Sequence, residues 1–178
     1  MRWLTFFALI YIAAALQSAH LGQLNTHGYF HLEFIPLLAI FYCLYAERES
    51  ALLASLLCGL VYDLTSQSLL GMEMILLGLM ALAITKIRAH VFRNNIVSQI
   101  VIAFFAIMIF LFARMLLTNL ILWTAGKTAL IPDNLPYSLI IFSSAAYTAV
   151  LAPIVFRGLF FLGGLLGFES HPTRASYR

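Results

Sequence analysis

Charged residues are scarce in this chain: of its 178 residues, 10% are Asp, Glu, Lys or Arg, whereas 63% are hydrophobic. Soluble domains carry about 25% charged and about 45–50% apolar residues, so the composition excludes an ordinary soluble globular protein. The mean hydropathy of +0.98 agrees with this exclusion. We therefore expect a single integral-membrane helical domain over residues 1–168, followed by a polar cytoplasmic tail over residues 169–178.

Cysteine is also rare, and no cluster of metal-binding side chains is visible. The two cysteines, Cys43 and Cys58, each lie within an apolar run, which gives neither a disulfide framework nor the spacing of a metal site. Three histidines, His20, His27 and His31, lie in a polar connection without a supporting group of cysteines or carboxylates. This pattern favours buried thiols and interfacial histidines, so we expect no metal.

Catalytic motifs are lacking as well. No Ser, Cys or Thr stands beside a plausible histidine base, and there is no glycine-rich loop that could hold a phosphate. Asp63 and Asp133 could in principle form an aspartyl pair like that of a membrane signal peptidase. The Asn, Arg and Gly motifs that surround the acids of that family are missing, so we expect no enzyme and no cofactor.

What the chain does contain is a series of apolar runs. Six runs predict a polytopic all-α membrane protein with about six transmembrane helices: residues 3–16, 33–46, 51–62, 72–85, 96–123 and 137–156. The first run could be a cleaved signal peptide or a retained span, and we favour the span. The net charge of +3 does not indicate nucleic acid as a partner, because the basic residues lie in the gaps between runs.

The basic residues also predict an orientation in the lipid bilayer. If the gaps alternate sides, Lys127 falls alone on one side and Arg114 lies within a span. Basic residues mark the cytoplasmic side of a membrane protein, so we expect a multi-pass protein with both termini in the cytoplasm. The remaining basic residues all fall on that side: Arg2, Arg48, Lys86, Arg88, Arg93, Arg157, Arg174 and Arg178.

The most informative stretch is the polar turn between the third and fourth runs. An apolar helix is predicted to run through Gly59 into Asp63, and mostly small polar residues follow before Gly71 begins the next helix. An ionisable residue between two membrane segments is costly and is therefore a functional candidate. We interpret Gly59, Asp63 and Gly71 as a structural and functional turn.

Arg114 is the predicted partner of this turn. It lies 19 residues beyond Asn95, or roughly 28 Å along a helix, which places it at a depth similar to that of Asp63. A charge within the membrane needs a partner, a backbone carbonyl or water, so we predict an Asp63–Arg114 ion pair. Two alternatives stay open: each charge could reach the outer surface separately, or Glu73 could be the partner of Arg114.

The sixth run carries small residues at helical spacing. Such residues let helix backbones approach closely in lipid, where packing drives association. We predict a helix-packing face that contacts other helices of the chain, with contact to another protein as the alternative. The face consists of Ser144, Ala145, Thr148, Ala149 and Ala152.

Residues 34–42 (FIPLLAIFY), residues 56–64 (LLCGLVYDL) and the polar turn that ends in Leu70-Gly71 together resemble the MreD family, the bacterial rod shape-determining membrane proteins. The similarity extends over about residues 33–123 and is best at Gly59, Asp63 and Gly71. Members of that family often begin the second span with Pro-Asp, where this chain has Glu33 ahead of Pro36.

The resemblance implies a non-enzymatic scaffold or regulator of the cell-elongation machinery, which builds side-wall peptidoglycan and maintains rod shape. It implies the bacterial cytoplasmic membrane as location and MreC as partner, with the MreB filament and the wall glycan polymerase and transpeptidase bound directly or through MreC. It also implies a fold similar to the substrate-binding subunits of energy-coupling-factor transporters. The alternative function is therefore such a subunit, with scattered outer-side groups as ligand contacts: Tyr29, His31, Glu33, Glu73 and Tyr137.

Overall fold

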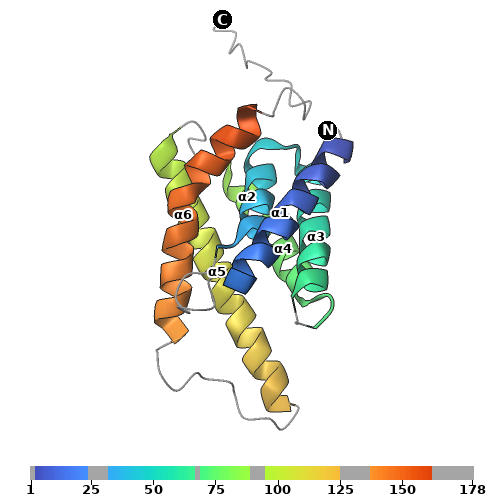
Figure 1. Ribbon diagram of the computed structural model, residues 1–178, viewed down its shortest axis with the longest axis vertical. Coiled ribbons are helices and arrows are strands. Elements are labelled where there is room, and N and C mark those ends of the chain that lie inside the picture. Colours follow the sequence, from blue (N-terminus) through green and yellow to red (C-terminus); the bar gives the residue numbers. More distant parts are fainter. Residues whose placement is uncertain (1–2, 24–31, 67–68, 89–94, 125–136, 162–178) are drawn as a thin grey trace, which may run out of the picture.

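The structure, a computed structural model, describes residues 3–23, 32–66, 69–88, 95–124 and 137–161. Within these residues the chain forms six α-helices and no strand (Figure 1), which confirms the predicted all-α fold. The predicted tail over residues 169–178 lies outside the described part, as do His27 and His31. The helices are α1 (Trp3–Gln23), α2 (Phe34–Tyr45), α3 (Arg48–Thr65), α4 (Met72–Ile87), α5 (Ile96–Thr124) and α6 (Tyr137–Phe161).

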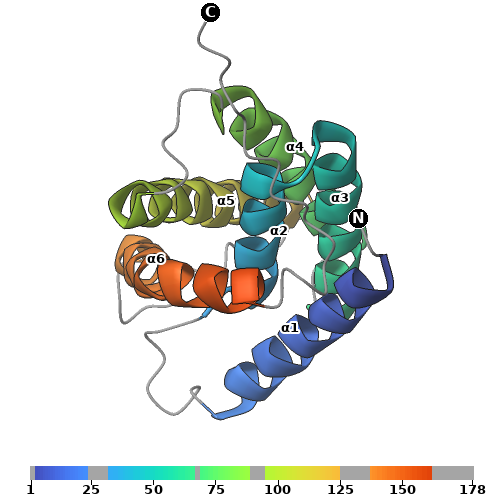
Figure 2. The same cartoon turned by 90° about the horizontal axis from the view of Figure 1, so that it is seen from above.

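Helix α2 lies at the centre of the bundle, where it contacts each of the other five helices (Figure 2). Every residue from Ile35 to Leu44 is buried, as expected for a helix that is hydrophobic on all sides. Pro36 lies in the first turn of α2, where a missing N–H group costs nothing. The helix has only 12 residues, so its two ends lie inside the bundle that surrounds it.

The turn between α2 and α3 is shorter than the sequence predicts. The predicted runs 33–46 and 51–62 leave a gap at residues 47–50, but α3 already begins at Arg48. The N–H group of Ala51 donates to the carbonyl of Glu47 at 2.8 Å, which closes the first helical turn. Glu49 lies in that turn, where the positive end of the helix dipole favours an acidic side chain. The charged residues therefore start a helix instead of interrupting one.

Helices α5 and α6 lie side by side, and both are long and apolar enough to cross a membrane (Figures 1 and 2). The apolar segments of α1 and α2 are shorter. Figure 1 also shows that α5 runs well past the ends of α1 to α4. Two described helices thus meet the length and composition of a membrane span, and the count of six spans stays a prediction.

Helix α6 directs its small residues into the bundle. It contains Pro153, which removes one backbone hydrogen bond and accounts for the bend along this helix (Figure 2). The small residues of its predicted face are each at most 2% exposed: Ser144, Ala145, Thr148, Ala149 and Ala152.

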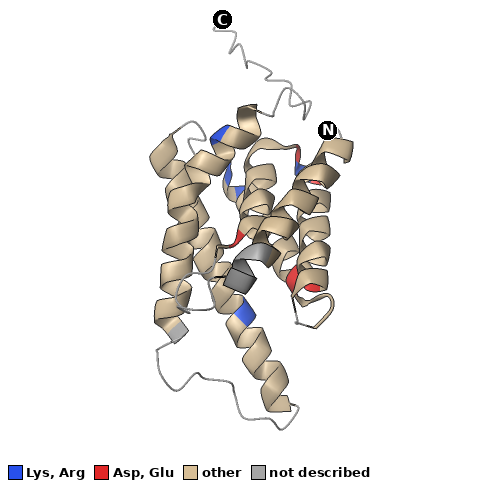
Figure 3. Ribbon diagram, in the orientation of Figure 1, with Lys and Arg blue, Asp and Glu red and all other residues tan. Residues whose placement is uncertain are grey.

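The basic residues of the described helices gather at one end of the bundle (Figure 3). They lie at the start of α3 (Arg48), at the end of α4 (Lys86 and Arg88) and near the end of α6 (Arg157). Arg114 differs from them, because it lies inside α5 toward the opposite end. We refer to the end that carries Arg48, Lys86, Arg88 and Arg157 as the basic end of the molecule.

Candidate functional site

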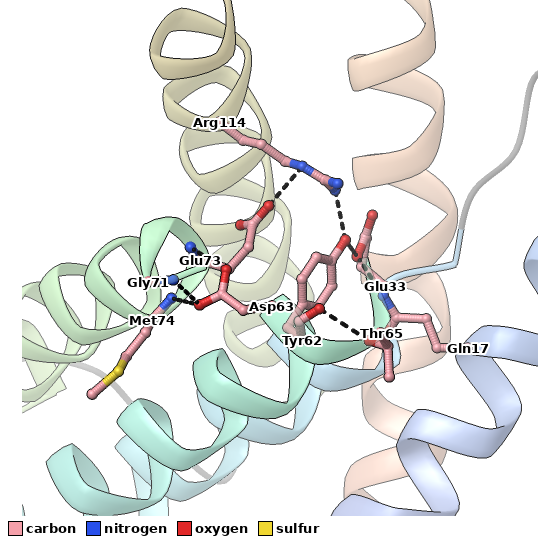
Figure 4. Close-up of polar contacts among 9 residues, drawn as sticks. All are labelled: Gln17, Glu33, Tyr62, Asp63, Thr65, Gly71, Glu73, Met74 and Arg114. Atoms are coloured by element: carbon pink, nitrogen blue, oxygen red, sulfur yellow. Dashed lines mark hydrogen bonds and ion pairs between the residues drawn. The ribbon is translucent and has the colours of Figure 1, made fainter. Parts of the chain in front are cut away.

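The carboxylate of Asp63, in the last turn of α3, binds the beginning of α4 (Figure 4). Its Oδ2 accepts hydrogen bonds from the N–H groups of Gly71, at 3.0 Å, and Met74, at 3.2 Å. Its Oδ1 accepts one from the N–H group of Glu73 at 3.0 Å. Asp63 is 3% exposed, so these are buried, charge-assisted contacts of the stronger kind.

These contacts complete the hydrogen bonding of the first turn of α4. A helix begins with four N–H groups that have no partner within the helix, and such groups are costly in lipid. Here the N–H of Met72 donates to Leu69 and that of Ile75 donates to Gly71, both at 3.1 Å. Asp63 accepts from the two N–H groups between them. It therefore acts as an N-cap supplied from the preceding helix, and its charge also complements the helix dipole.

The two glycines of the turn make this geometry possible. Gly71 has a φ of 94°, a left-handed conformation that glycine adopts without a steric penalty. Gly59 lies one helical turn before Asp63, on the same face of α3. A Cβ atom on Gly59 would lie 2.4 Å from the Cα atom of Met74 and 2.9 Å from the carbonyl oxygen of Glu73. The absent side chain lets α3 approach α4 closely enough for Asp63 to reach its N-terminus.

Arg114 pairs with Glu73, which corrects the ion pair predicted from the sequence. Its Nε lies 2.8 Å from Oε1 of Glu73, and its Nη1 donates to the hydroxyl oxygen of Tyr62 at 2.6 Å. The guanidinium carbon also lies 5.2 Å from the centroid of the Tyr62 ring, within the range of a cation–π contact. The carboxylate of Asp63 instead accepts hydrogen bonds from the N–H groups of α4.

Glu33 extends this cluster to the remaining helices (Figure 4). The hydroxyl of Tyr62 donates to its Oε2 at 2.9 Å, and Nε2 of Gln17 donates to the same oxygen at 3.2 Å. The backbone N–H of Glu33 donates to Oγ1 of Thr148 at 3.4 Å. Oε1 of Gln17 accepts from the N–H of Ile35 at 3.1 Å, in the first turn of α2.

Together these residues form a polar network to which all six described helices contribute. Asp63 belongs to it through its bond to the backbone of Glu73. We call it the six-helix network. It consists of Asp63 and one residue from each helix or its cap: Gln17 from α1, Glu33 at the N-cap of α2, Tyr62 from α3, Glu73 from α4, Arg114 from α5 and Thr148 from α6.

The network carries an excess of negative groups in a buried place. Glu33, Asp63 and Glu73 are 5%, 3% and 0% exposed, whereas the Arg114 side chain is 30% exposed. Oε2 of Glu73 accepts no hydrogen bond from any described residue. Buried charges are tolerated when they are paired, so Arg114 is the group on which the burial of Glu73 depends. These hydrogen bonds and the ion pair fix the six helices relative to one another.

Sequence reasoning identified part of this site and missed the rest. Gly59, Asp63 and Gly71 meet at one place, and Glu73 was the alternative partner of Arg114. Tyr62, Gln17 and Thr148 were not predicted as members. Tyr62 had a usable signal, because a tyrosine hydroxyl beside a membrane acid needs a partner. Gln17 gives no signal beyond polarity in an apolar run, and Thr148 is predicted only as part of the helix-packing face.

Other predicted groups lie apart from the site or outside the described residues. Cys43 and Cys58 are buried free thiols, and Asp133 lies outside the described residues. The described part of the chain contains no group of three or more His, Cys, Asp or Glu side chains that could hold a metal ion.

Comparison with known proteins gives one match. The family model described as rod shape-determining protein MreD matches residues 1–161. No curated protein and no solved structure matches the chain.

Proposed function

The chain belongs to the MreD family of rod shape-determining membrane proteins, and from this premise we propose that it is a non-enzymatic scaffold of the cell-elongation machinery. In this role it sits in the bacterial cytoplasmic membrane with MreC as its partner. The MreB filament and the wall glycan polymerase and transpeptidase bind it directly or through MreC. Through these contacts it supports side-wall peptidoglycan synthesis and so the rod shape of the cell.

The observation that carries the proposal is the six-helix network. Its side chains bind one another and backbone groups, and each of the six helices supplies a member. A scaffold has to present its surfaces in a fixed arrangement, and a shared buried hydrogen-bond network fixes helix register in a medium where no hydrophobic effect holds the helices together. The network thus keeps the arrangement of the helices fixed, which supports a structural role for the protein.

We further propose a topology of six membrane spans with both termini in the cytoplasm. The gathering of Arg48, Lys86, Arg88 and Arg157 at the basic end supports this orientation, because positive residues are retained on the cytoplasmic side. The six-helix network then lies in the outer half of the membrane, on the side opposite to the basic end. Asp63 and Glu73 hold the α3–α4 connection at that outer side.

The test of the function is depletion in the parent bacterium with complementation from a plasmid. Loss of the protein is expected to round or widen the cells, and the wild-type gene should restore rods. Purification of the tagged protein from native membranes should recover MreC and wall synthases. Cells that keep their shape but need a supplied vitamin, together with recovery of an ATPase pair, would refute the scaffold and favour the transporter subunit.

Nothing in the described residues favours the transporter alternative. Glu33 and Glu73, two of its five predicted ligand contacts, are buried and bonded within the network. The side chains of the other three, Tyr29, His31 and Tyr137, lie outside the description. A fold similar to that of energy-coupling-factor subunits stays a prediction from the family resemblance.

A further inference from the structure

An apolar groove lies between α4 and α5 on the outer surface of the bundle. Its volume is about 250 Å³, and apart from one arginine its lining is apolar. Helix α4 contributes Met80, Ala83 and Ile87, and α5 contributes Val101, Phe105 and Ile109. Ile87, Phe105 and Ile109 are more than half exposed, so the groove opens toward the medium that surrounds the protein. In a membrane protein that medium is lipid.

The exception in the lining is Arg88, which lies at the basic end of the groove. Its Nη1 donates to the carbonyls of Cys43, at 3.3 Å, and Ala46, at the C-terminus of α2. An arginine has five N–H donors, and both of these bonds use Nη1. The Nε and Nη2 groups have no acceptor among the described residues. The mouth of the groove therefore carries the positive charge of Arg88 and N–H donors that no described residue accepts, and Lys86, two residues earlier, is exposed outside the lining.

We propose that this groove binds an anionic phospholipid of the leaflet at the basic end, with an acyl chain between α4 and α5 and the phosphate at Arg88. The apolar lining matches a hydrocarbon chain, and the arginine fork matches a phosphate. Basic pockets between membrane helices are known to take such headgroups.

The test measures lipid retention by native mass spectrometry of the full-length protein in detergent. The probes are phosphatidylglycerol and phosphatidylcholine with the same acyl chains, so that only the headgroup charge differs. The wild type should retain phosphatidylglycerol about fivefold more strongly. Arg88→Gln should abolish this preference. Lys86→Gln, which removes a neighbouring charge outside the lining, should keep most of it.

A second pair of variants tests the groove without touching Arg88. Ala83→Phe fills the groove from α4 and should lower retention of both lipids, whereas Leu82→Phe, on the adjacent position outside the lining, should not. Thermal melting without added lipid shows that each variant is folded. Equal retention of the two lipids by the wild type would overturn the proposal. So would equal losses in Arg88→Gln and Lys86→Gln, or unchanged retention in Ala83→Phe.

Discussion

The close approach of α3 and α4 at Gly59 can be tested by adding a single methyl group. In Gly59→Ala the new Cβ would lie 2.4 Å from the Cα atom of Met74 and 2.9 Å from a carbonyl oxygen of α4. Both neighbours are backbone atoms, which cannot rotate away as a side chain does. The two helices must therefore separate by roughly 1 Å to restore ordinary contact. Asp63, one turn further along α3, moves with this separation.

The magnitude follows from three contributions. Overpacking costs about 1–3 kcal/mol. Weakening one hydrogen bond between the Asp63 carboxylate and an N–H group of α4 costs about 1.5–3 kcal/mol. Replacing glycine by alanine within a helix returns about 0.5–1 kcal/mol. We expect a net loss of about 2–4 kcal/mol in the free energy of unfolding.

Two other helical glycines provide matched controls. At Gly78 a Cβ would meet Cδ2 of Leu56 at 2.9 Å, the end of a flexible side chain, so Gly78→Ala should change stability by less than about 1 kcal/mol. At Gly158 nothing lies within 4 Å of the new atom, so Gly158→Ala should stabilise by about 0.5–1 kcal/mol.

The assay is thermal unfolding of the purified variants in detergent, followed by far-ultraviolet circular dichroism. For a chain of this size, 1 kcal/mol shifts Tm by roughly 2–4 °C, so Gly59→Ala should melt roughly 5–15 °C below the wild type. Gly158→Ala should melt slightly above it. If Gly59→Ala melted at or above the wild type, the proposed contact between the two backbones would be refuted.

Three further outcomes are expected. Asp63→Asn should destabilise by about 2–3 kcal/mol in the same assay, because the amide keeps one acceptor oxygen for three N–H groups; a variant as stable as the wild type would contradict the N-cap role. In double-mutant cycles, Arg114→Gln should couple to Glu73→Gln by about 1–2 kcal/mol and less strongly to Asp63→Asn; the opposite ranking would restore the pair predicted from the sequence. A reporter active only outside the cytoplasm should be silent when fused at Arg178 and active at Ala129, and the reverse pattern would overturn the topology.

The helices were predictable because apolar runs bounded by polar residues leave little choice in a chain of this composition. The start of α5 at Ile96 and the start of α4 at Met72 coincide with their apolar runs. The start of α3 was missed, because Arg48 and Glu49 have the polarity of a turn. The helix dipole stabilises Glu49 in the first turn of α3, but this depends on where the helix begins, which the pattern does not reveal.

The depth of the site residues in the membrane could be predicted from the sequence, but their interaction partners could not. Counting residues along a helix places Arg114 and Asp63 at similar levels of the membrane. It does not give the side of the bundle that each faces, and Glu73 lies at the same level. The backbone competes for Asp63, because the first turn of α4 needs hydrogen-bond acceptors and the Asp63 carboxylate supplies them. The sequence singles out Glu33 as the acid ahead of Pro36. Its contacts with Gln17, Tyr62 and Thr148 join segments far apart in the chain, so they could not be predicted.

The unequal lengths of the helices have a consequence for the surrounding bilayer. Helix α5, with 29 residues, is roughly 43 Å long, whereas α4, with 16, is roughly 24 Å long. The hydrocarbon layer of a membrane is about 30 Å thick. Helix α5 is therefore longer than this layer is thick, and α4 is shorter. The apolar residues Leu116, Leu120 and Trp123 near the end of α5 are more than half exposed and favour tilting of that helix over its exposure to water. In the proposed six-span topology, the lipid beside α3 and α4 has to thin. A protein with such a gradient in hydrophobic thickness is expected to collect where the membrane is thin or easily deformed.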